Sequence, residues 1–422
     1  MILIFFPAAT ARTSADPGLC AGRSRAGSGG WALIRGIVAS LALLYLGLAP
    51  AAAEEDVETL RIVYFTQEVE RPSVIYGLDE PPQDEGLQGG RLAITDNNTT
   101  GQFTNQKFEF FEVVVPVDGD MVAAFRELVG QGYRHIITNL PADKLLKLAD
   151  LPEARGVLIY NAGASDDTLR NADCRPNVLH ILPSRAMLAD ALAQYLIWKK
   201  WRKWFLVVGR RDEDRLFAAA VRRAAGRFGG KIVAEKVWEY GPDARRTAQA
   251  EMPVFTQGID YDVLIVADEI GEFGEYLIYR TWEPRLVAGT QGLVPTMWHR
   301  THEQWGGWQL QRRFHKLVGR WMTPLDHAVW AAVRVIGEAA TRAQSTAFDK
   351  VAAYLRGPEF ALAAFKGVAL SFRPWNGQLR QPVLLAAPRT LVSVSPQRGF
   401  LHQYTELDTL GYDRPESGCE LD

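Results

Sequence analysis

The sequence predicts an α/β protein with two doubly wound parallel-sheet lobes. Short apolar runs alternate with segments of helical periodicity along most of the 422 residues, as parallel sheets covered on both faces require. The alternation occurs twice, in sets of about 110–125 residues, and each set is large enough for its own sheet. A composition of 47% hydrophobic and 23% charged residues is that of a globular protein with a sizeable core.

The first set of elements contains four short strands and the helices between them. Its first strand, 59–65, is rich in β-branched and aromatic residues, and the helix after it repeats apolar positions at a period near 3.6. The predicted strands are 59–65, 108–115, 135–138 and 156–160, and the predicted helices are 85–98, 119–130 and 142–149. Every strand is brief and apolar, so no strand face is expected to meet water.

The second set repeats this order after a loop at 161–175. Its strands are predicted at 178–182, 204–208, 231–238, 263–267 and 285–287, and its helices at 185–201, 214–228, 244–256 and 273–281. A second complete alternation favours a second sheet over an extension of the first.

The last part of the chain is predicted to return to both lobes. Helices at 308–317, 324–342 and 348–355 precede strands at 367–372 and 381–386, and the Asn-Gly step at 376–377 between those strands is a strong hairpin signal. We therefore expect one lobe of residues 59–183 plus 291–365, a second of 184–290 plus 366–422, and a three-segment hinge between them.

The first 53 residues have the features of a signal peptide with an N-terminal extension. An apolar run at 36–48 follows Arg35 and precedes three alanines that end at Ala53, and the run is shorter than a membrane span. We predict cleavage after Ala53 and a periplasmic product that is not embedded in the membrane. Cys174 and Cys419 would then meet an oxidising compartment, where they either pair or remain separate thiols.

Charge and motifs exclude several classes of function. A formal net charge of −2 and a pI near 6.4 provide no general attraction to nucleic acid or to anionic lipid. The sequence contains no GxSxG, Walker A or HExxH motif. His299 and His302 have metal-like spacing but lack a clear third ligand, so no metal and no cofactor are predicted.

Two segments carry a resemblance to a known family. Residues 84–93 (DEGLQGGRLA) and 324–338 (PLDHAVWAAVRVIGE), together with the order of elements, resemble the Leu/Ile/Val-binding group of type I periplasmic solute-binding proteins of ABC importers. The resemblance implies the type I periplasmic binding protein fold, a small-molecule ligand in the cleft between the lobes, and no catalysis. It also implies an ABC permease with its ATPase as the partner.

Four stretches resemble a narrower subfamily, the binding proteins encoded beside PQQ-dependent alcohol dehydrogenases. They are LRIVYFTQEVERP (60–72), DEGLQGGRLAITDNNTTG (84–101), PSRAMLADALAQYLIWKKWRKW (183–204) and TELDTLGYDRPESGC (405–419). This resemblance implies a physiological link to PQQ-dependent alcohol oxidation. Two alternatives stay open: a periplasmic sensor or accessory protein of a quinoprotein dehydrogenase system and, less favoured, a hydrolase.

The same resemblance suggests where a ligand would bind. In the family, a ligand carboxylate meets hydroxyl and backbone N–H groups after lobe-one strands, and an acidic side chain of lobe two takes the ammonium group. The residues at matching positions here are Asn139, Gly163, Ala164, Ser165, Asp268 and Glu269, with Trp298 as an aromatic that could stack on the ligand.

Each of these candidates has a structural alternative. The two acids could cap a helix instead, and the tryptophan could belong to the core. The first loop, 139–142, lacks the hydroxyl group usual in the family, which argues against an ordinary α-amino acid.

Overall fold

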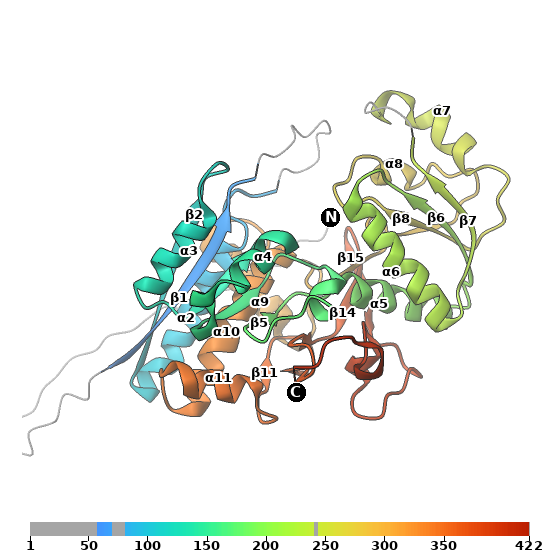
Figure 1. Cartoon of the computed structure of the whole chain (residues 1–422). Helices are drawn as coiled ribbons and strands as arrows, with labels where there is room; N and C mark the ends of the chain where they lie inside the picture. Colours follow the sequence, from blue (N-terminus) through green and yellow to red (C-terminus); the bar gives the residue numbers. More distant parts are fainter. Residues whose placement is uncertain (1–56, 70–80, 240–243, 422) are drawn as a thin grey trace, which may run out of the picture. The chain divides into compact units, whose positions relative to one another are not determined.

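The structure is a computed structural model that describes residues 57–69, 81–239 and 244–421 (Figure 1). The predicted signal peptide and its cleavage site at Ala53 lie outside these residues. No helix among the described residues is long and apolar enough to cross a membrane.

Sheet A is a five-stranded parallel sheet in the order β2-β1-β3-β4-β5. Its strands are β1 (Glu58–Gln67), β2 (Gln106–Val115), β3 (His135–Asn139), β4 (Leu158–Asn161) and β5 (Val178–His180). The helices packed on it are α2 (Leu87–Thr104), α3 (Met121–Gly130), α4 (Ala142–Ala149), α9 (Gly307–Val318), α10 (Pro324–Ala343) and α11 (Phe348–Arg356). We call sheet A with these helices the sheet A body.

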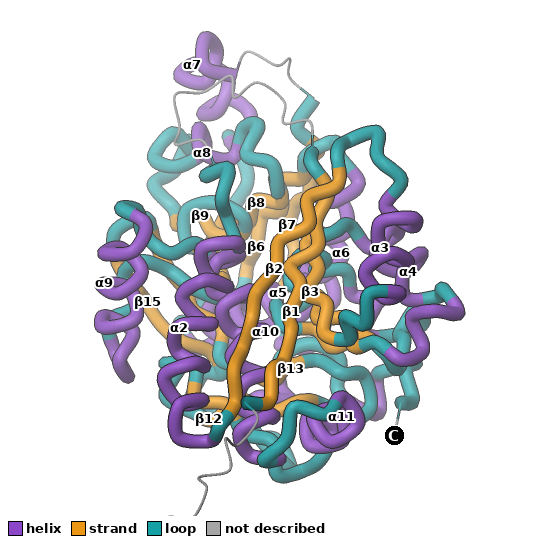
Figure 2. The backbone as a smooth tube through the Cα atoms, turned by 90° about the vertical axis from the view of Figure 1, so that its left-hand side faces the viewer, coloured by secondary structure: helices purple, strands orange, loops and turns teal. Residues whose placement is uncertain are grey.

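Both faces of sheet A are apolar because successive strand residues point to opposite sides. On β1, Ile62 and Tyr64 pack in the core shared with α2 and α10, whereas Val63 and Phe65 pack in the core shared with α3 and α4. Figure 2 shows α3 and α4 on one side of the sheet and α2 and α10 on the other. Continuous apolar strands thus produce the doubly wound arrangement that the sequence predicts.

Sheet B is a four-stranded parallel sheet in the order β7-β6-β8-β9. Its strands are β6 (Lys203–Val208), β7 (Lys231–Val237), β8 (Val263–Ala267) and β9 (Leu286–Gly289), and its helices are α5 (Arg185–Trp198), α6 (Asp212–Phe228), α7 (Ala244–Thr256) and α8 (Gly274–Leu277). The alternation recurs on β6, where Leu206 faces the core of α5 and α6 and Val207 faces that of α7 and α8. We call this unit the sheet B body.

The chain changes between the two bodies at three places. Core membership passes from the sheet A body to the sheet B body after Ile181, returns between Leu293 and Met297, and changes again between Leu379 and Val383. The three-segment connection was predicted from the order of elements. The third change lies beyond the predicted boundary at 365, because the strand that follows still packs in the sheet A core.

The remaining strands form two small antiparallel sheets that differ from the prediction. One has the order β10-β14-β15 and the other β11-β12-β13. Their strands are β10 (Val294–Thr296), β14 (Val383–Ala387), β15 (Thr390–Ser395), β11 (Leu362–Ala363), β12 (Ala369–Phe372) and β13 (Leu379–Arg380). The Asn-Gly hairpin joins β12 to β13, whereas β14, predicted as its second strand, pairs with β10 and β15.

One helix is also shorter than predicted. The segment 273–281 contains only the single turn α8, because the next residue, Ile278, has an extended backbone with ψ of 121°, which ends a helix. Short 3-10 helices complete the fold: η1 (Pro152–Gly156), η2 (Asp167–Arg170), η3 (Gln304–Gly306), η4 (Glu406–Thr409) and η5 (Arg414–Glu416).

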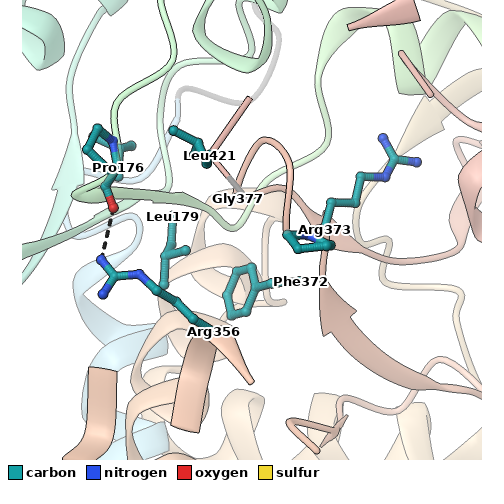
Figure 3. Close-up of a pocket in the computed structure, with 9 residues that line it drawn as sticks. Pro176, Leu179, Arg356, Phe372, Arg373, Gly377 and Leu421 are labelled. Carbon is teal, nitrogen blue, oxygen red and sulfur yellow. Dashed lines mark hydrogen bonds between the residues drawn. The ribbon is translucent and has the colours of Figure 1, made fainter. Parts of the chain in front are cut away.

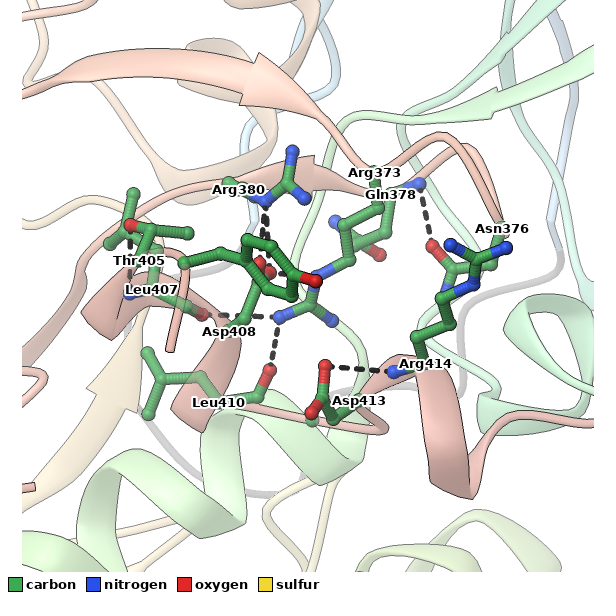
Figure 4. Close-up of polar contacts among 12 residues, drawn as sticks. Arg373, Asn376, Gln378, Arg380, Thr405, Leu407, Asp408, Leu410, Asp413 and Arg414 are labelled. Atoms are coloured by element: carbon green, nitrogen blue, oxygen red, sulfur yellow. Dashed lines mark hydrogen bonds and ion pairs between the residues drawn. The ribbon is translucent and has the colours of Figure 1, made fainter. Parts of the chain in front are cut away.

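The C-terminal segment, residues 405–421, is attached to both bodies. Figure 4 shows the buried guanidinium of Arg373, which donates to Asp408 Oδ1 at 2.8 Å and to the Leu410 carbonyl at 2.7 Å, and Arg380, which donates to the same carboxylate. Cys419 forms a disulfide with Cys174 in the loop before β5, with Cα atoms 5.9 Å apart. The two cysteines that the sequence left open are therefore paired.

Candidate functional site

The predicted ligand residues lie at the carboxyl ends of strands in both sheets. Asn139 ends β3, the loop 162–166 follows β4, and Asp268 follows β8. In open α/β sheets, ligands bind outside the carboxyl ends of the strands. The candidate site is therefore built from loops whose positions are fixed by two buried sheets.

The loop after β4 is held by its own side chains. The Asn161 side-chain oxygen accepts the Ala164 N–H at 2.9 Å, and its amide donates to the Ala164 carbonyl at 2.8 Å. A Cβ atom on Gly163 would lie 2.5 Å from Oδ1 of Asn139, so only glycine permits this close approach. Asn139 and Gly163 are thus in contact, while both backbone polar groups of Ala164 are already paired inside the loop.

Arg185, at the first position of α5, joins the loop after β4 to the loop after β8. Its backbone N–H donates to the Ser165 carbonyl at 2.9 Å. Its guanidinium makes two hydrogen bonds to Glu269, from Nε at 2.7 Å and from Nη2 at 2.8 Å. The structure therefore brings Ser165 and Glu269 together through a cation that sequence analysis did not select.

The same guanidinium also faces Asp166. Nη1 of Arg185 lies 3.1 Å from Oδ2 of Asp166, yet this nitrogen is buried and has no hydrogen-bond partner of acceptable geometry. The carboxylates hold the pKa of Arg185 above its ordinary value even though burial opposes them. The Arg185 side chain is 6% exposed, whereas those of Asp166 and Glu269 are each 24% exposed. Arg185, Asp166 and Glu269 form what we call the Arg185 cluster: a buried cation held between two carboxylates that are partly exposed to water.

Asp268 serves the loop that leads into α8. Its two carboxylate oxygens accept four backbone N–H groups, those of Gly271, Glu272, Phe273 and Gly274, at 2.7–3.1 Å. The residue is 1% exposed. Four donors fill the acceptor positions of a carboxylate, so Asp268 has the capping role that was the alternative for it. Glu269 is the one of the two acids that lies in the Arg185 cluster.

Trp298 belongs to the sheet A core. It is 0% exposed, and its ring stacks on His327 with centroids 4.2 Å apart and planes 8° from parallel. A side chain in this position cannot stack on a ligand that arrives from solvent. The core packing that was the alternative for Trp298 is what the structure shows.

A separate cavity of about 190 Å³ lies near β5, α11 and β12 (Figure 3). Its wall is mainly apolar, and the Arg356 guanidinium donates across it to the Pro176 carbonyl at 2.9 Å. It is lined by Pro176, Val178, Leu179, Arg356, Phe372, Arg373, Pro374, Gly377 and Leu421. None of the predicted ligand residues lines it. No group of three or more His, Cys, Asp or Glu residues in the described chain could hold a metal ion.

Comparisons with known proteins agree on the fold. The model of a periplasmic binding protein family matches residues 84–250, and no curated protein matches the sequence. A periplasmic binding protein from Burkholderia mallei is 18% identical with a TM-score of 0.63, and the alignment covers 86% of this chain and 99% of that one. A branched-chain amino acid ABC transporter ligand-binding protein from Burkholderia xenovorans is 16% identical with a TM-score of 0.65, covering 79% and 95%.

A third solved structure contains a bound ligand. It is an ABC transporter solute-binding protein from R. palustris in complex with benzoate, 11% identical with a TM-score of 0.59, and the alignment covers 86% of this chain and 99% of that chain. The two parallel sheets and these likenesses confirm the predicted fold class: the chain has the α/β fold of type I periplasmic binding proteins.

Proposed function

We propose that this protein is the periplasmic substrate-binding component of an ABC transporter and binds one small solute beside the Arg185 cluster. The observation that carries the proposal is the position of that cluster, at the carboxyl ends of strands in both sheets and bonded to Ser165 and Glu269. Proteins of similar fold include one named for branched-chain amino acid transport and one solved in complex with benzoate. The protein would act by binding, and its partners would be a permease and its ATPase.

Binding would favour one arrangement of the two bodies. We propose two lobes that follow the predicted division except at its last boundary: residues 59–183 plus 291–380, and residues 184–290 plus 381–422. The three connections described above join them. A solute that contacts loops of both lobes stabilises the arrangement in which both contacts are made. The size of the effect depends on how much more tightly the solute binds that arrangement than the others. The permease would respond to that arrangement.

The cluster also restricts the class of solute. Glu269, the lobe-two acid that an amino group would need, is already bonded twice to Arg185, and Asp268 is filled by backbone donors. An α-amino acid would have to displace a nearly buried arginine from its carboxylate, which leaves a charge unpaired. We therefore propose a solute without an ammonium group.

A thermal-shift screen of the purified protein tests this function. The panel contains amino acids, alcohols, aldehydes, carboxylates including benzoate, and PQQ. A solute at 100 times its Kd should add about 2.7 kcal/mol to the free energy of unfolding. The largest shift is expected from a compound that lacks an amino group, and a largest shift with leucine would contradict the proposed class.

Variants of the cluster test the location. Ser165→Ala and Glu269→Gln should weaken the binding of the solute that the screen identifies. Glu272→Gln is the matched control, because Glu272 lies in the same loop and bonds Arg211 at the surface. Equal affinity in all three variants would place the binding site elsewhere.

The resemblance to proteins encoded beside PQQ-dependent alcohol dehydrogenases supports a finer proposal, that the solute is connected with alcohol oxidation. Deletion of the gene should then impair growth on alcohols while leaving growth on other carbon sources unchanged. Normal growth of the deletion strain on every alcohol tested would contradict this link without affecting the solute-binding proposal.

A further inference from the structure

Three tryptophans are exposed around α9. Trp305 lies in the 3-10 turn directly before the helix, Trp308 in its first turn, and Trp321 just beyond its end, and they are 51%, 43% and 38% exposed. The opposite face of α9 is buried through Leu310 and Phe314, and the helix packs beside α2 at the left edge of Figure 2. The exposed rings therefore lie on and beside a helix whose other face is already packed in the core.

The backbone on either side of α9 holds these rings in place. Trp305 has a left-handed backbone with φ of 52°, and its ring covers Gly367 so closely that a Cβ there would lie 2.5 Å from the ring. A bulky residue in that region is strained and must be maintained by its surroundings. At the other end, Gly319 turns the chain with φ of 80°, and Trp321 returns to within 6.4 Å of Trp308, measured between ring centroids.

Two cations on the exposed face of α9 lack carboxylate partners. Arg312 and Lys316 are exposed and make no ion pair with any described residue, although the neighbouring Arg313 pairs with Asp96 and Arg320 pairs with Asp326. These two cations follow Trp308 at intervals of four residues, on the same side of the helix. We call Trp305, Trp308, Trp321, Arg312 and Lys316 the tryptophan surface.

The chemistry of this surface fits the headgroup region of an anionic membrane. Tryptophan has an apolar body and a polar N–H, and it is enriched where hydrocarbon meets water. None of the three indole N–H groups has a hydrogen-bond partner within the described residues, so each is free to bond a phosphate or ester oxygen. Unpaired lysine and arginine side chains add attraction to anionic lipid over about one Debye length.

We propose that the tryptophan surface docks this protein reversibly on anionic phospholipid. The argument uses only side chains around α9 and does not depend on the solute-binding site. Residues 54–422 contain 43 basic and 48 acidic residues, a net charge of −5. Because this charge is spread over the whole surface, the local cations decide the electrostatic interaction at short range. A protein held at a membrane surface finds membrane-bound partners by a two-dimensional search.

Co-sedimentation with lipid vesicles tests the proposal. The mature protein, residues 54–422, is used without added solute. It should sediment with vesicles of phosphatidylcholine plus phosphatidylglycerol at low salt and remain in the supernatant with phosphatidylcholine alone. Each cation near an anionic surface is worth roughly fivefold in partitioning, so the double variant Arg312→Gln/Lys316→Gln should partition about 25-fold more weakly. High salt should release the wild-type protein.

A second pair of variants tests the aromatic contribution. Trp308→Ala/Trp321→Ala should also lower partitioning, whereas Trp282→Ala should not, because Trp282 is similarly exposed, at 55%, but lies beyond α8. Circular dichroism of each variant checks that it is folded. Absence of binding to phosphatidylglycerol vesicles would overturn the proposal and leave an acidic protein as the occupant to test. Equal loss in the Trp282 variant would also overturn it.

Discussion

The sheet A body and the sheet B body share one architecture but bury different ionisable groups. The sheet A body buries His135, His180 and His327, which are 3%, 1% and 0% exposed. The sheet B body buries no histidine among its described residues, and its buried ionisable groups include Asp190, Asp214 and Asp268. The sheet A body also buries an aspartate, Asp326 in α10, so the buried histidines are what distinguish the two bodies.

This difference means that acid acts on the two bodies in opposite directions. Burial lowers the pKa of His135 to about 4 and holds the pKa of His180 and His327 well below the ordinary value. Burial raises the pKa of Asp190 to about 6, although Arg223 and Arg227 oppose that shift. Acid must therefore charge the histidines against their burial, whereas it neutralises a buried carboxylate.

The largest expected effect is a loss of stability in acid that begins in the sheet A body. The unfolded chain binds protons to these histidines below about pH 6.5 and the folded chain does not, so the free energy of unfolding falls as the pH falls from there towards 4. The lowered pKa of His135 alone should reduce the free energy of unfolding by about 3 kcal/mol over this pH range, and His180 and His327 act in the same direction. Urea unfolding across this pH range measures the loss, and hydrogen exchange should show early opening of sheet A.

Two variants sharpen this prediction. His135→Gln should flatten the pH dependence by about 3 kcal/mol, whereas His315→Gln, a change at an exposed position on α9, should leave it unchanged. Early exchange in sheet B at low pH would show that the contrast between the bodies is wrong.

The buried acid of the sheet B body should matter greatly for stability at neutral pH. Asp190 is 0% exposed and accepts from Arg223, Arg227 and the Gly411 N–H at 2.8–3.1 Å. Asp190→Ala should lower the free energy of unfolding by about 3–5 kcal/mol, because two partly buried arginines lose their partner. In the same network, Glu416→Ala should cost about 0–1 kcal/mol, since its side chain is 41% exposed. Similar losses in the two variants would contradict the role of burial.

Removal of the disulfide tests how strongly the C-terminal segment links the two bodies. Cys174 lies in a loop of the sheet A body, and the segment that contains Cys419 is bonded to α5 and α6 through Gly411 and Glu416. The double variant Cys174→Ser/Cys419→Ser should lower the free energy of unfolding by about 2–5 kcal/mol, as measured by denaturant unfolding. Reduction of the wild-type protein is the control and should produce a similar loss. No change in either case would show that the non-covalent contacts alone suffice.

The smallest of these effects is expected at Asp268. Asp268→Asn replaces one acceptor oxygen by a donor group, so two of the four backbone bonds lose their acceptor and the cost should be about 1–3 kcal/mol. Hydrogen exchange at 271–274 should accelerate. Glu272→Gln, at the surface of the same loop, is the control and should cost about 0–1 kcal/mol. Unchanged exchange in Asp268→Asn would show that the carboxylate does not hold the loop.

Periodicity predicted the fold well because its signals are local. Alternate apolar residues on one strand, such as Ile62 and Val63, face separate cores, and a continuous apolar run records both faces at once. The hairpin partner was harder to predict. Asn376-Gly377 identifies the turn, but nothing near it indicates that β14 leaves the hairpin sheet and pairs with β10 and β15.

The site was less predictable because its contacts are not local. Arg185 meets a carboxylate that lies 84 residues away in the sequence, and an arginine at the start of a helix has no feature that would select it. Trp298 follows a connection between the bodies, and this position suggested that its ring lines the cleft. Its stacking partner is instead His327 in α10. For Asp268, the sequence contained the right alternative, since acids before a short helix commonly cap it.

The disulfide also sets an order of events during synthesis. Cys419 follows Cys174 by 245 residues, so at about 5–20 residues per second the first cysteine exists for roughly 10–50 s before its partner is made. Within the described residues, a nascent chain that stops early therefore carries a lone thiol at Cys174. The described part of the finished molecule carries no free thiol, because Cys174 and Cys419 are paired, so thiol chemistry at Cys174 can distinguish incomplete copies from complete ones.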